Sequence, residues 1–241
     1  MSALTAATTW HDVECGSYDA DLSLWEELAE RQGGPVLELG CGTGRVALHL
    51  ARRGHRVYAL DREPELLGSL IERAEGLAVD PFAVDGREYQ LPEPVCLALA
   101  PMQFLQLLPE RDDRLACLRR AAVALRPGGL LAAAIVESLP RSDGALPPLP
   151  DVREVDGWVY SSLPVAAVTA DDRIVLRRLR QTVSPDGELS EEEDEVQLRT
   201  FSAEELEAEA ATVGLLPAGR RVIPATDAHV GSTVVLFEKA A

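Results

Sequence analysis

The sequence predicts an α/β fold with a single doubly wound, mostly parallel sheet. Between residues 36 and 136, short apolar runs alternate with longer helical stretches, a pattern typical of parallel strands joined by helices. A glycine-rich turn follows the first apolar run, and a proline-glycine turn precedes the last. The chain has 241 residues, 46% of them apolar, which is enough to bury one substantial core.

The elements of this core follow in chain order. Strands are expected at residues 36–39, 56–60, 77–84, 95–100 and 130–136, with helices ending near Arg53, over 64–74 and over 112–125. Pro64 suits the first turn of its helix, because a proline there removes no hydrogen bond that the helix needs. The turn at 126–129, Arg-Pro-Gly-Gly, ends the third helix before the fifth strand begins.

The chain changes character after Glu137. Residues 139–150 hold four prolines and are expected to form a loop. Three strand-like stretches follow at 158–164, 174–183 and 195–201, with a turn at 185–187 between the last two. We therefore expect a small antiparallel β insertion after the fifth strand, placed to cap the substrate.

The end of the chain returns to the main fold. Ser202 and Glu205 form a capping box, with Phe201 and Leu206 placed as a hydrophobic staple for the helix that follows. The predicted organisation is a single domain in four parts: an N-terminal arm and helix (1–34), a core (35–137), the insertion (138–201), and the final helix with a closing hairpin at 215–223 and 232–237 (202–241).

Composition restricts the partners of the protein. Its 40 acidic and 23 basic residues give a formal net charge of −17, which repels phosphate backbones and acidic lipid surfaces. No stretch approaches the roughly 20 apolar residues of a membrane-spanning helix, and the first nine residues lack the pattern of a secretory signal. The cysteines are widely spaced and the histidines show no HxxxH pair, so no metal site is expected. We expect a cytoplasmic protein with a small-molecule partner, neither nucleic acid nor membrane; the oligomeric state stays open.

The segment VLELGCGTGR, residues 36–45, is the most informative part of the chain. A buried strand runs into three glycines at alternate positions, Gly40, Gly42 and Gly44, and a helix starts behind them. Glycines let the backbone take positive φ values and approach a ligand closely, and a helix N-terminus favours a carboxylate or phosphate. Nicotinamide-binding folds also use a glycine turn, so this feature alone does not identify the ligand.

Acidic residues on three strands narrow the choice of ligand. Glu38 lies within the otherwise apolar first strand, where an unpaired charge is costly. Asp61 ends the second strand, where a carboxylate can accept both hydroxyls of a ribose. Asp85 and Gly86 follow the third strand and offer a carboxylate for an amino group and an N–H for a ring nitrogen. Together these groups describe an adenosine that carries a carboxylate-bearing tail rather than a pyrophosphate.

One family shows this pattern. Over about residues 35–137 the chain resembles the class I S-adenosylmethionine-dependent methyltransferases, through Glu38, the three glycines, Asp61, Asp85 and the turn at 125–129. The resemblance implies a seven-stranded sheet of order 3-2-1-4-5-7-6 with strand seven antiparallel. It also implies that Glu38 and the glycines hold the methionine end of S-adenosylmethionine, that Asp61 holds the ribose, and that Asp85 with Gly86 holds the adenine.

Six further residues complete the predicted cofactor contacts: Tyr18, Trp25, Cys41, Arg45, Arg62 and Gln103. An aromatic side chain of the N-terminal arm, Tyr18 or Trp25, can face the positive sulfonium. For Trp25 the favoured interpretation is a position in the core. The interpretation favoured for Cys41 is small size rather than reactivity. For Arg45 the alternatives are the cofactor tail and solvent, and for Gln103 they are cofactor, acceptor or a structural turn.

The sequence therefore predicts methyl transfer from S-adenosylmethionine to an oxygen or nitrogen of a small molecule. In-line displacement of this kind depends mainly on holding the acceptor at attack distance in a dry pocket. No catalytic residue is assigned: His11 and His229 titrate in the range of a base, but structural roles are favoured for both. Arginines of the insertion, at 177, 178 and 180, either bind an acidic acceptor or, as favoured, pair with the acidic run at 191–194.

Two alternatives belong to other functional classes. An NAD(P)-dependent oxidoreductase shares the glycine turn and the acid after the second strand, but its GxGxxG spacing and a YxxxK motif are missing. A domain that binds S-adenosylmethionine without catalysis would carry the same motif. A protein or RNA methyltransferase is disfavoured by the negative charge and by the missing NPPY-like signature after the fourth strand.

Overall fold

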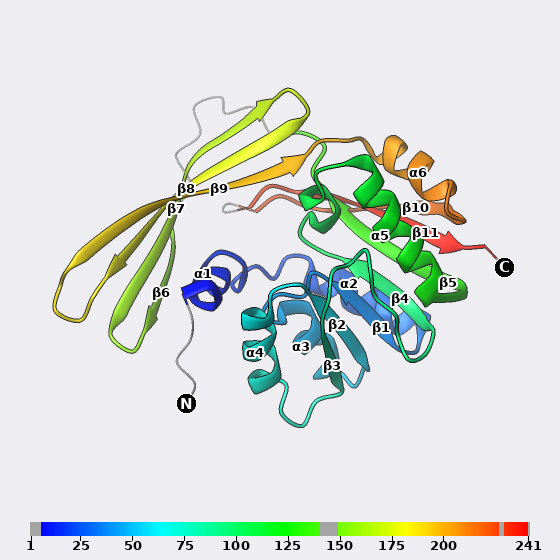
Figure 1. The fold of residues 1–241 in the computed structure, drawn as a ribbon, viewed down its shortest axis with the longest axis horizontal. Helices are drawn as coiled ribbons and strands as arrows, with labels where there is room; N and C mark the ends of the chain where they lie inside the picture. Colours follow the sequence, from blue (N-terminus) through cyan, green and yellow to red (C-terminus); the bar gives the residue numbers. More distant parts are fainter. Residues whose placement is uncertain (1–5, 140–148, 227–228, 241) are drawn as a thin grey trace.

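The computed structural model describes residues 6–139, 149–226 and 229–240 (Figure 1). Within these residues the main sheet has seven strands: β1 (Val36–Leu39), β2 (Val57–Asp61), β3 (Val79–Ala83), β4 (Val95–Ala100), β5 (Leu125–Ile135), β10 (Leu215–Ile223) and β11 (Ser232–Lys239). Their order is β3-β2-β1-β4-β5-β11-β10, and β11 runs antiparallel to both of its neighbours. The predicted fold class and strand order are confirmed.

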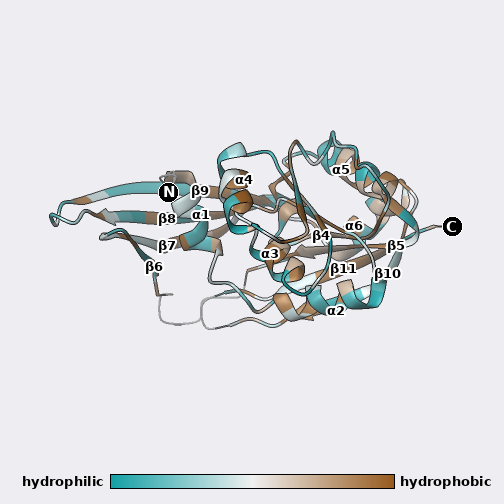
Figure 2. Cartoon of the chain, turned by 90° about the horizontal axis from the view of Figure 1, so that it is seen from below, coloured by the Kyte–Doolittle hydropathy of each residue, from teal (hydrophilic) through white to brown (hydrophobic). Residues whose placement is uncertain are grey.

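Helices cover both faces of this sheet. One face carries α2 (Leu22–Gln32), α3 (Arg45–Ala51) and α4 (Pro64–Arg73), and the other carries α5 (Arg111–Ala124) and α6 (Ala203–Ala211). Alternation along β1 serves both layers, since Leu37 and Leu39 pack with the α5 and α6 side while Val36 packs with the other. Figure 2 shows these central strands as strongly apolar, in contrast to the outer faces of the helices.

The predicted start of the last helix is confirmed in detail. The Ser202 hydroxyl accepts the N–H of Glu205 at 3.1 Å, and the Glu205 carboxylate accepts the N–H of Ser202 at 2.7 Å. Phe201 and Leu206 on either side are buried. This capping box fixes the point at which the chain returns from the insertion to the main sheet.

The insertion is a separate antiparallel sheet that extends away from the main sheet as a wing (Figure 1). In the described part of the chain it has four strands, where three were expected: β6 (Asp151–Val155), β7 (Trp158–Ala170), β8 (Arg173–Val183) and β9 (Leu189–Arg199). The acidic start of β9 escaped prediction because such residues rarely favour strands. On this outer strand Glu192, Asp194 and Glu195 lie opposite arginines of β8, which partly compensates the negative charge of the strand.

A short helix that the sequence analysis did not separate from the arm, α1 (Ala6–Cys15), lies between the wing and the main fold (Figure 1). It packs against α4, β6 and β7, and the rings of Trp10 and Tyr160 meet edge to face with centroids 5.4 Å apart. No helix in the described ranges is long and apolar enough to cross a membrane.

Candidate active site

The site is built at the edge where the parallel strands β1 to β4 end. The loop after β1 turns through Gly40, Gly42 and Gly44, whose φ angles of 67°, 55° and 93° lie in the left-handed region. Side chains with a Cβ are strained in this conformation, so the three glycines are a conformational requirement of the loop. The loop then enters α3, whose first turn faces the end of β1.

Close packing against these glycines adds a second requirement. A Cβ on Gly40 would collide with the ring of Phe104, and a Cβ on Gly42 would collide with the imidazole of His11. The Phe104 ring also lies within 3.0 Å of the Cβ position of Gly86. The glycine loop is therefore lined by an aromatic ring from the segment after β4 and by a histidine from α1.

Glu38 lies beneath this loop. Its side chain is buried, 3% exposed, and accepts a hydrogen bond from the backbone N–H of Ala47 in α3. Burial raises the pKa of Glu38 to about 8, against the opposing charge of Arg45. One carboxyl oxygen, Oε2, has no hydrogen-bond partner among the described residues, so it can accept a hydrogen bond from a cationic or N–H group of a ligand.

Asp61 ends β2 directly opposite the loop. Its Oδ2 accepts the N–H of Gly42 at 2.8 Å, and its Oδ1 accepts the N–H of Glu63 at 3.0 Å. A carboxylate has about four lone-pair positions, so two remain to accept the two hydroxyls of a vicinal diol. Asp61 thus holds the glycine loop in place and keeps the capacity that the ribose prediction requires.

Asp85 follows β3 and is already paired in this structure. Its two oxygens accept Nε and Nη2 of Arg87, each at 2.8 Å. The Arg87 hydrogen bonds lower the pKa of Asp85, which stays ionised. Asp113 of α5 holds Arg87 from the other side at 2.5 Å. An amino group of a ligand that binds Asp85 would therefore share this carboxylate with the guanidinium of Arg87.

The N-terminal arm reaches the site through Tyr18. Its backbone oxygen accepts Nη1 of Arg45 at 2.9 Å, and the same guanidinium forms two hydrogen bonds to Asp21, at 2.5 and 2.8 Å. The Tyr18 ring also contacts the ring of His229, with centroids 4.7 Å apart. Arg45 is therefore an anchor for the arm, a role that neither sequence alternative included.

Gln103 lies on the opposite side, after β4. Both Met102 and Gln103 have positive φ angles, 46° and 60°, which are uncommon for residues with side chains and cluster at functional sites. The amide nitrogen of Gln103 donates to the Ser232 hydroxyl at 3.0 Å. Its amide oxygen is the end of the side chain that stays available to a ligand.

Three of the predicted contacts have side chains directed elsewhere. Trp25 is fully buried in the core and its indole N–H donates to Asp21 at 2.8 Å. The thiol of Cys41 is buried beside the carbonyl of Gly42, and burial raises its pKa. Arg62 is exposed and pairs with the adjacent Glu63. Trp25 therefore has the core position that helical periodicity could not distinguish from a ligand contact.

Two residues at the site were not predicted to be there. The sequence suggests His11 only as a possible base, and after the fourth strand it singles out Gln103 rather than its neighbour Phe104. Burial lowers the pKa of His11, so the imidazole on the glycine loop is neutral near pH 7. Phe104 follows the fourth strand, which is a signal that the sequence does contain, whereas nothing in the local sequence places α1 on the loop.

The position of α1 is fixed by Asp12, which is 4% exposed. Its carboxylate accepts Thr43 of the glycine loop at 2.8 Å, Arg73 of α4 at 2.9 Å and Arg153 of β6 at 2.9 Å. Burial opposes the ionisation of Asp12, but the hydrogen bonds outweigh it and lower its pKa. A single carboxylate thus joins the arm, the loop, the helical layer and the wing.

Glu14 makes a second connection from α1 to the wing. Its carboxylate accepts Nε and Nη2 of Arg180 at 2.8 and 2.9 Å and the Ser162 hydroxyl at 2.9 Å. The prediction that the insertion arginines pair with the acidic run at 191–194 is correct only in part. Arg180 pairs with Asp194, as predicted. Arg177 instead pairs with Glu195, and Arg178 pairs with Asp151. Glu14 was not foreseen, because it lies 166 residues away in the chain.

The core of the chain is similar in sequence to known methyltransferases. A family model described as a methyltransferase domain matches residues 36–129. The cypemycin N-terminal methyltransferase of a Streptomyces species is 32% identical over 97 residues, 40% of each chain. The malonyl-[acyl-carrier protein] O-methyltransferase of Serratia marcescens is 30% identical over 167 residues, 64% of this chain and 60% of that one. The chain thus spans less than two thirds of the length of these curated relatives.

Solved structures resemble the whole chain. A sugar N-methyltransferase from a Streptoalloteichus species, KedS8, aligns with a TM-score of 0.77 at 16% identity, over 100% of this chain and 96% of that one. CalS10, an amino pentose methyltransferase from Micromonospora echinaspora, aligns with a TM-score of 0.73 at 17% identity over all of both chains. Residues 36–129 therefore match the methyltransferase-domain family model, and the chain as a whole has the fold of these methyltransferase structures.

Proposed function

We propose that the protein transfers a methyl group from S-adenosylmethionine to an oxygen or nitrogen of a small molecule. The observation that carries the proposal is the set of acids around the glycine loop. Glu38 supplies a buried oxygen without a partner, and Asp61 keeps free lone pairs at the end of β2. A carboxylate on each of three neighbouring strand ends suits an adenosine with an amino-acid tail.

The described residues fit this cofactor as follows. Glu38 and the backbone of Gly40 to Gly44, including Cys41, would hold the methionine end. Asp61 would accept the ribose hydroxyls, with Arg62 beside it, and Asp85 and Gly86 would hold the adenine. Tyr18 and Gln103 would face the cofactor from the arm and from the segment after β4. Trp25 is left out because its side chain is wholly inside the core, and Arg45 acts through Tyr18.

The bound cofactor supplies an electrophilic methyl group, and the protein positions the acceptor and excludes water from the site. Asp12 holds the arm against the glycine loop on one side of the site, and Glu14 joins the arm to the wing. Holding a nucleophile at attack distance in this way can lower the barrier by about 7–11 kcal/mol. His11 is held neutral by burial at the loop, and a neutral imidazole is the form that accepts a proton.

The choice of acceptor is supported by two observations. The net charge of −17 disfavours nucleic acids and acidic membranes, which agrees with a small acceptor and a cytoplasmic location. Structural neighbours are named as N-methyltransferases of sugars or glycopeptides and curated relatives as O-methyltransferases, which is consistent with a nitrogen or an oxygen acceptor. Neither the sequence comparison nor the structural comparison supports the oxidoreductase alternative. Measuring the conversion of S-adenosylmethionine to S-adenosylhomocysteine with candidate acceptors would distinguish a catalyst from a domain that only binds the cofactor.

Asp61→Ala is expected to weaken the binding of S-adenosylhomocysteine by about tenfold to a hundredfold, since a charge-assisted contact is worth about 1–3 kcal/mol. Calorimetric titration of the purified chain measures this change, with NAD titrated in parallel. Asp186→Ala, in the exposed turn of the wing, is the matched control and should bind like the parent. Binding of NAD alone, or unchanged affinity in Asp61→Ala, would contradict the assignment.

A further inference from the structure

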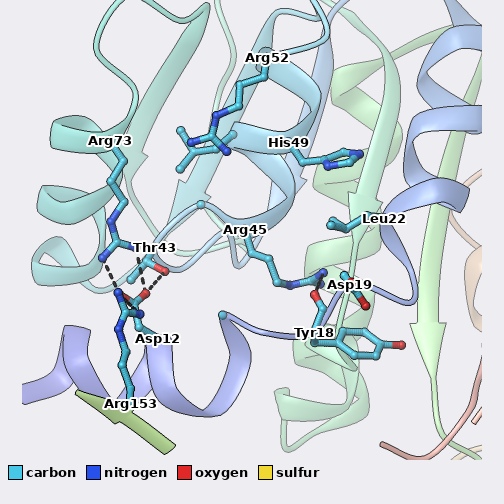
Figure 3. Close-up of a pocket in the computed structure, with 13 residues that line it drawn as sticks. Asp12, Tyr18, Asp19, Leu22, Thr43, Arg45, His49, Arg52, Arg73 and Arg153 are labelled. Atoms are coloured by element: carbon cyan, nitrogen blue, oxygen red, sulfur yellow. Dashed lines mark hydrogen bonds and ion pairs between the residues drawn. The ribbon is translucent and has the colours of Figure 1, made fainter. Parts of the chain in front are cut away.

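A groove of about 280 Å³ lies along α3 (Figure 3). It is bounded by the turn between α1 and α2, by α3 and by the end of α4. Its lining includes Thr43 and Gly44 at the far end of the glycine loop. Tyr18 and Gly44, both proposed to contact the cofactor, line the groove, whereas Gly40, Asp61 and Asp85 are not among its described lining residues, so the groove adjoins the cofactor site.

The charge of this groove is opposite to that of the protein. Four arginines line it, Arg45, Arg52, Arg73 and Arg153, against two carboxylates, Asp12 and Asp19. Asp21, behind Arg45, adds a third carboxylate, so the balance is still positive. In a chain with a formal net charge of −17, a concave surface with excess positive charge attracts anions selectively.

Arg52 supplies the unmatched charge. Arg73 and Arg153 share Asp12, and Arg45 is bound to Asp21. The side chain of Arg52, which follows the last turn of α3, has no hydrogen bond or ion pair in the described part of the chain. Figure 3 shows its side chain directed into the groove, above the cluster around Asp12. A guanidinium offers five N–H donors in a planar fork that matches an oxyanion.

We propose that this groove binds a phosphate group, either free or carried by a small molecule, with Arg52 as the principal ligand. Arg73 reaches the groove from α4 and shares its charge between Asp12 and the bound anion. The concave surface and the absence of a carboxylate partner for Arg52 favour phosphate over a diffuse ion atmosphere. Arg52 is not among the proposed cofactor contacts, so the phosphate site adjoins the cofactor site without sharing its principal ligand with it.

Titration of the whole chain with inorganic phosphate tests this proposal, at constant ionic strength adjusted with sodium chloride. The unfolding temperature and the calorimetric heat are both recorded, with and without saturating S-adenosylhomocysteine. Arg52→Gln is the test variant. Arg119→Gln is the matched control, because Arg119 is exposed on α5, on the other face of the sheet, and has no partner in the described residues.

We expect saturable binding with a dissociation constant below about 10 mM, weakened at least tenfold by Arg52→Gln and unchanged by Arg119→Gln. Arg52→Gln should unfold at the parent temperature without phosphate, which shows that the variant is folded. Equal binding by Arg52→Gln and the parent would overturn the proposal, as would no binding by the parent. Phosphate binding that S-adenosylhomocysteine abolishes and that Arg52→Gln leaves unchanged would place the phosphate in the cofactor site and would also overturn the proposal.

Discussion

Replacing Glu38 with glutamine is expected to remove a loss of stability that the parent protein undergoes between about pH 4.5 and pH 8. The folded protein keeps the Glu38 proton up to about pH 8, while the unfolded chain releases it near 4.5. In this window the folded state binds more protons, so the free energy of unfolding falls as the pH rises. At about 1.4 kcal/mol for each pH unit, the full effect is about 5 kcal/mol at most.

Urea unfolding at pH 5 and at pH 9 measures this difference. Glu38→Gln should be close to the parent at pH 5 and clearly more stable at pH 9, whereas Glu75→Gln, which changes an exposed carboxyl after α4, should follow the parent at both. Parallel pH profiles of Glu38→Gln and the parent would show that the buried carboxyl is not protonated.

The same carboxyl gives a test of the cofactor assignment. A cationic amino group that binds beside Oε2 lowers the pKa of Glu38, because it stabilises the ionised form. Binding of S-adenosylhomocysteine at pH 7 should therefore release a proton. Titrations in buffers with different ionisation enthalpies detect that proton, and Glu38→Gln should not release it.

Glu209→Ala is expected to destabilise the protein by about 3–5 kcal/mol, because it leaves the Arg114 guanidinium buried without its partner. The pair joins α5 to α6 through hydrogen bonds of 3.1 and 2.8 Å, and the two side chains are only 6% and 9% exposed. The Arg114 guanidinium also stacks on Phe201, 4.7 Å from the ring centroid. The charge therefore has little access to water when the carboxylate is removed.

Two further variants separate the buried pair from the general effect of losing a surface charge. Glu207→Ala removes a carboxylate from the same helix, but its partner Arg220 is 36% exposed, so the expected cost is about 1 kcal/mol or less. The double variant Arg114→Met with Glu209→Leu should recover most of the stability, since it replaces both charges with apolar groups. If Glu209→Ala and Glu207→Ala lower the free energy of unfolding by the same amount, burial does not make the Arg114–Glu209 pair more stabilising than the exposed pair.

The sequence predicted the parts of the molecule whose signals are local. Buried runs such as β1 and β4, the capping box at Ser202, and the acids at the strand ends are set by residues close together in the chain. The antiparallel final strand was reached through the family resemblance. These features account for the main sheet and for most of the proposed cofactor contacts.

What the sequence could not predict depends on contacts between distant segments. The place of His11 on Gly42 requires α1 to lie on the glycine loop, and no local pattern encodes that position. Helical periodicity gave Trp25 an inward face without showing whether a ligand or the core lies there. The acidic start of β9 pairs with β8, where Arg178 and Arg180 lie opposite Asp194 and Glu192.

The two carboxylates that fix α1 also determine when this helix can find its place during folding. Ser162 and Arg180, the partners of Glu14, lie 148 and 166 residues further along the chain, so these contacts form only after the wing has assembled. Contacts that close such long loops form late. Helix α1 is therefore expected to dock late and to open early. Its amide protons should exchange faster than those of the central sheet, which gives ligands a route into the site without global unfolding.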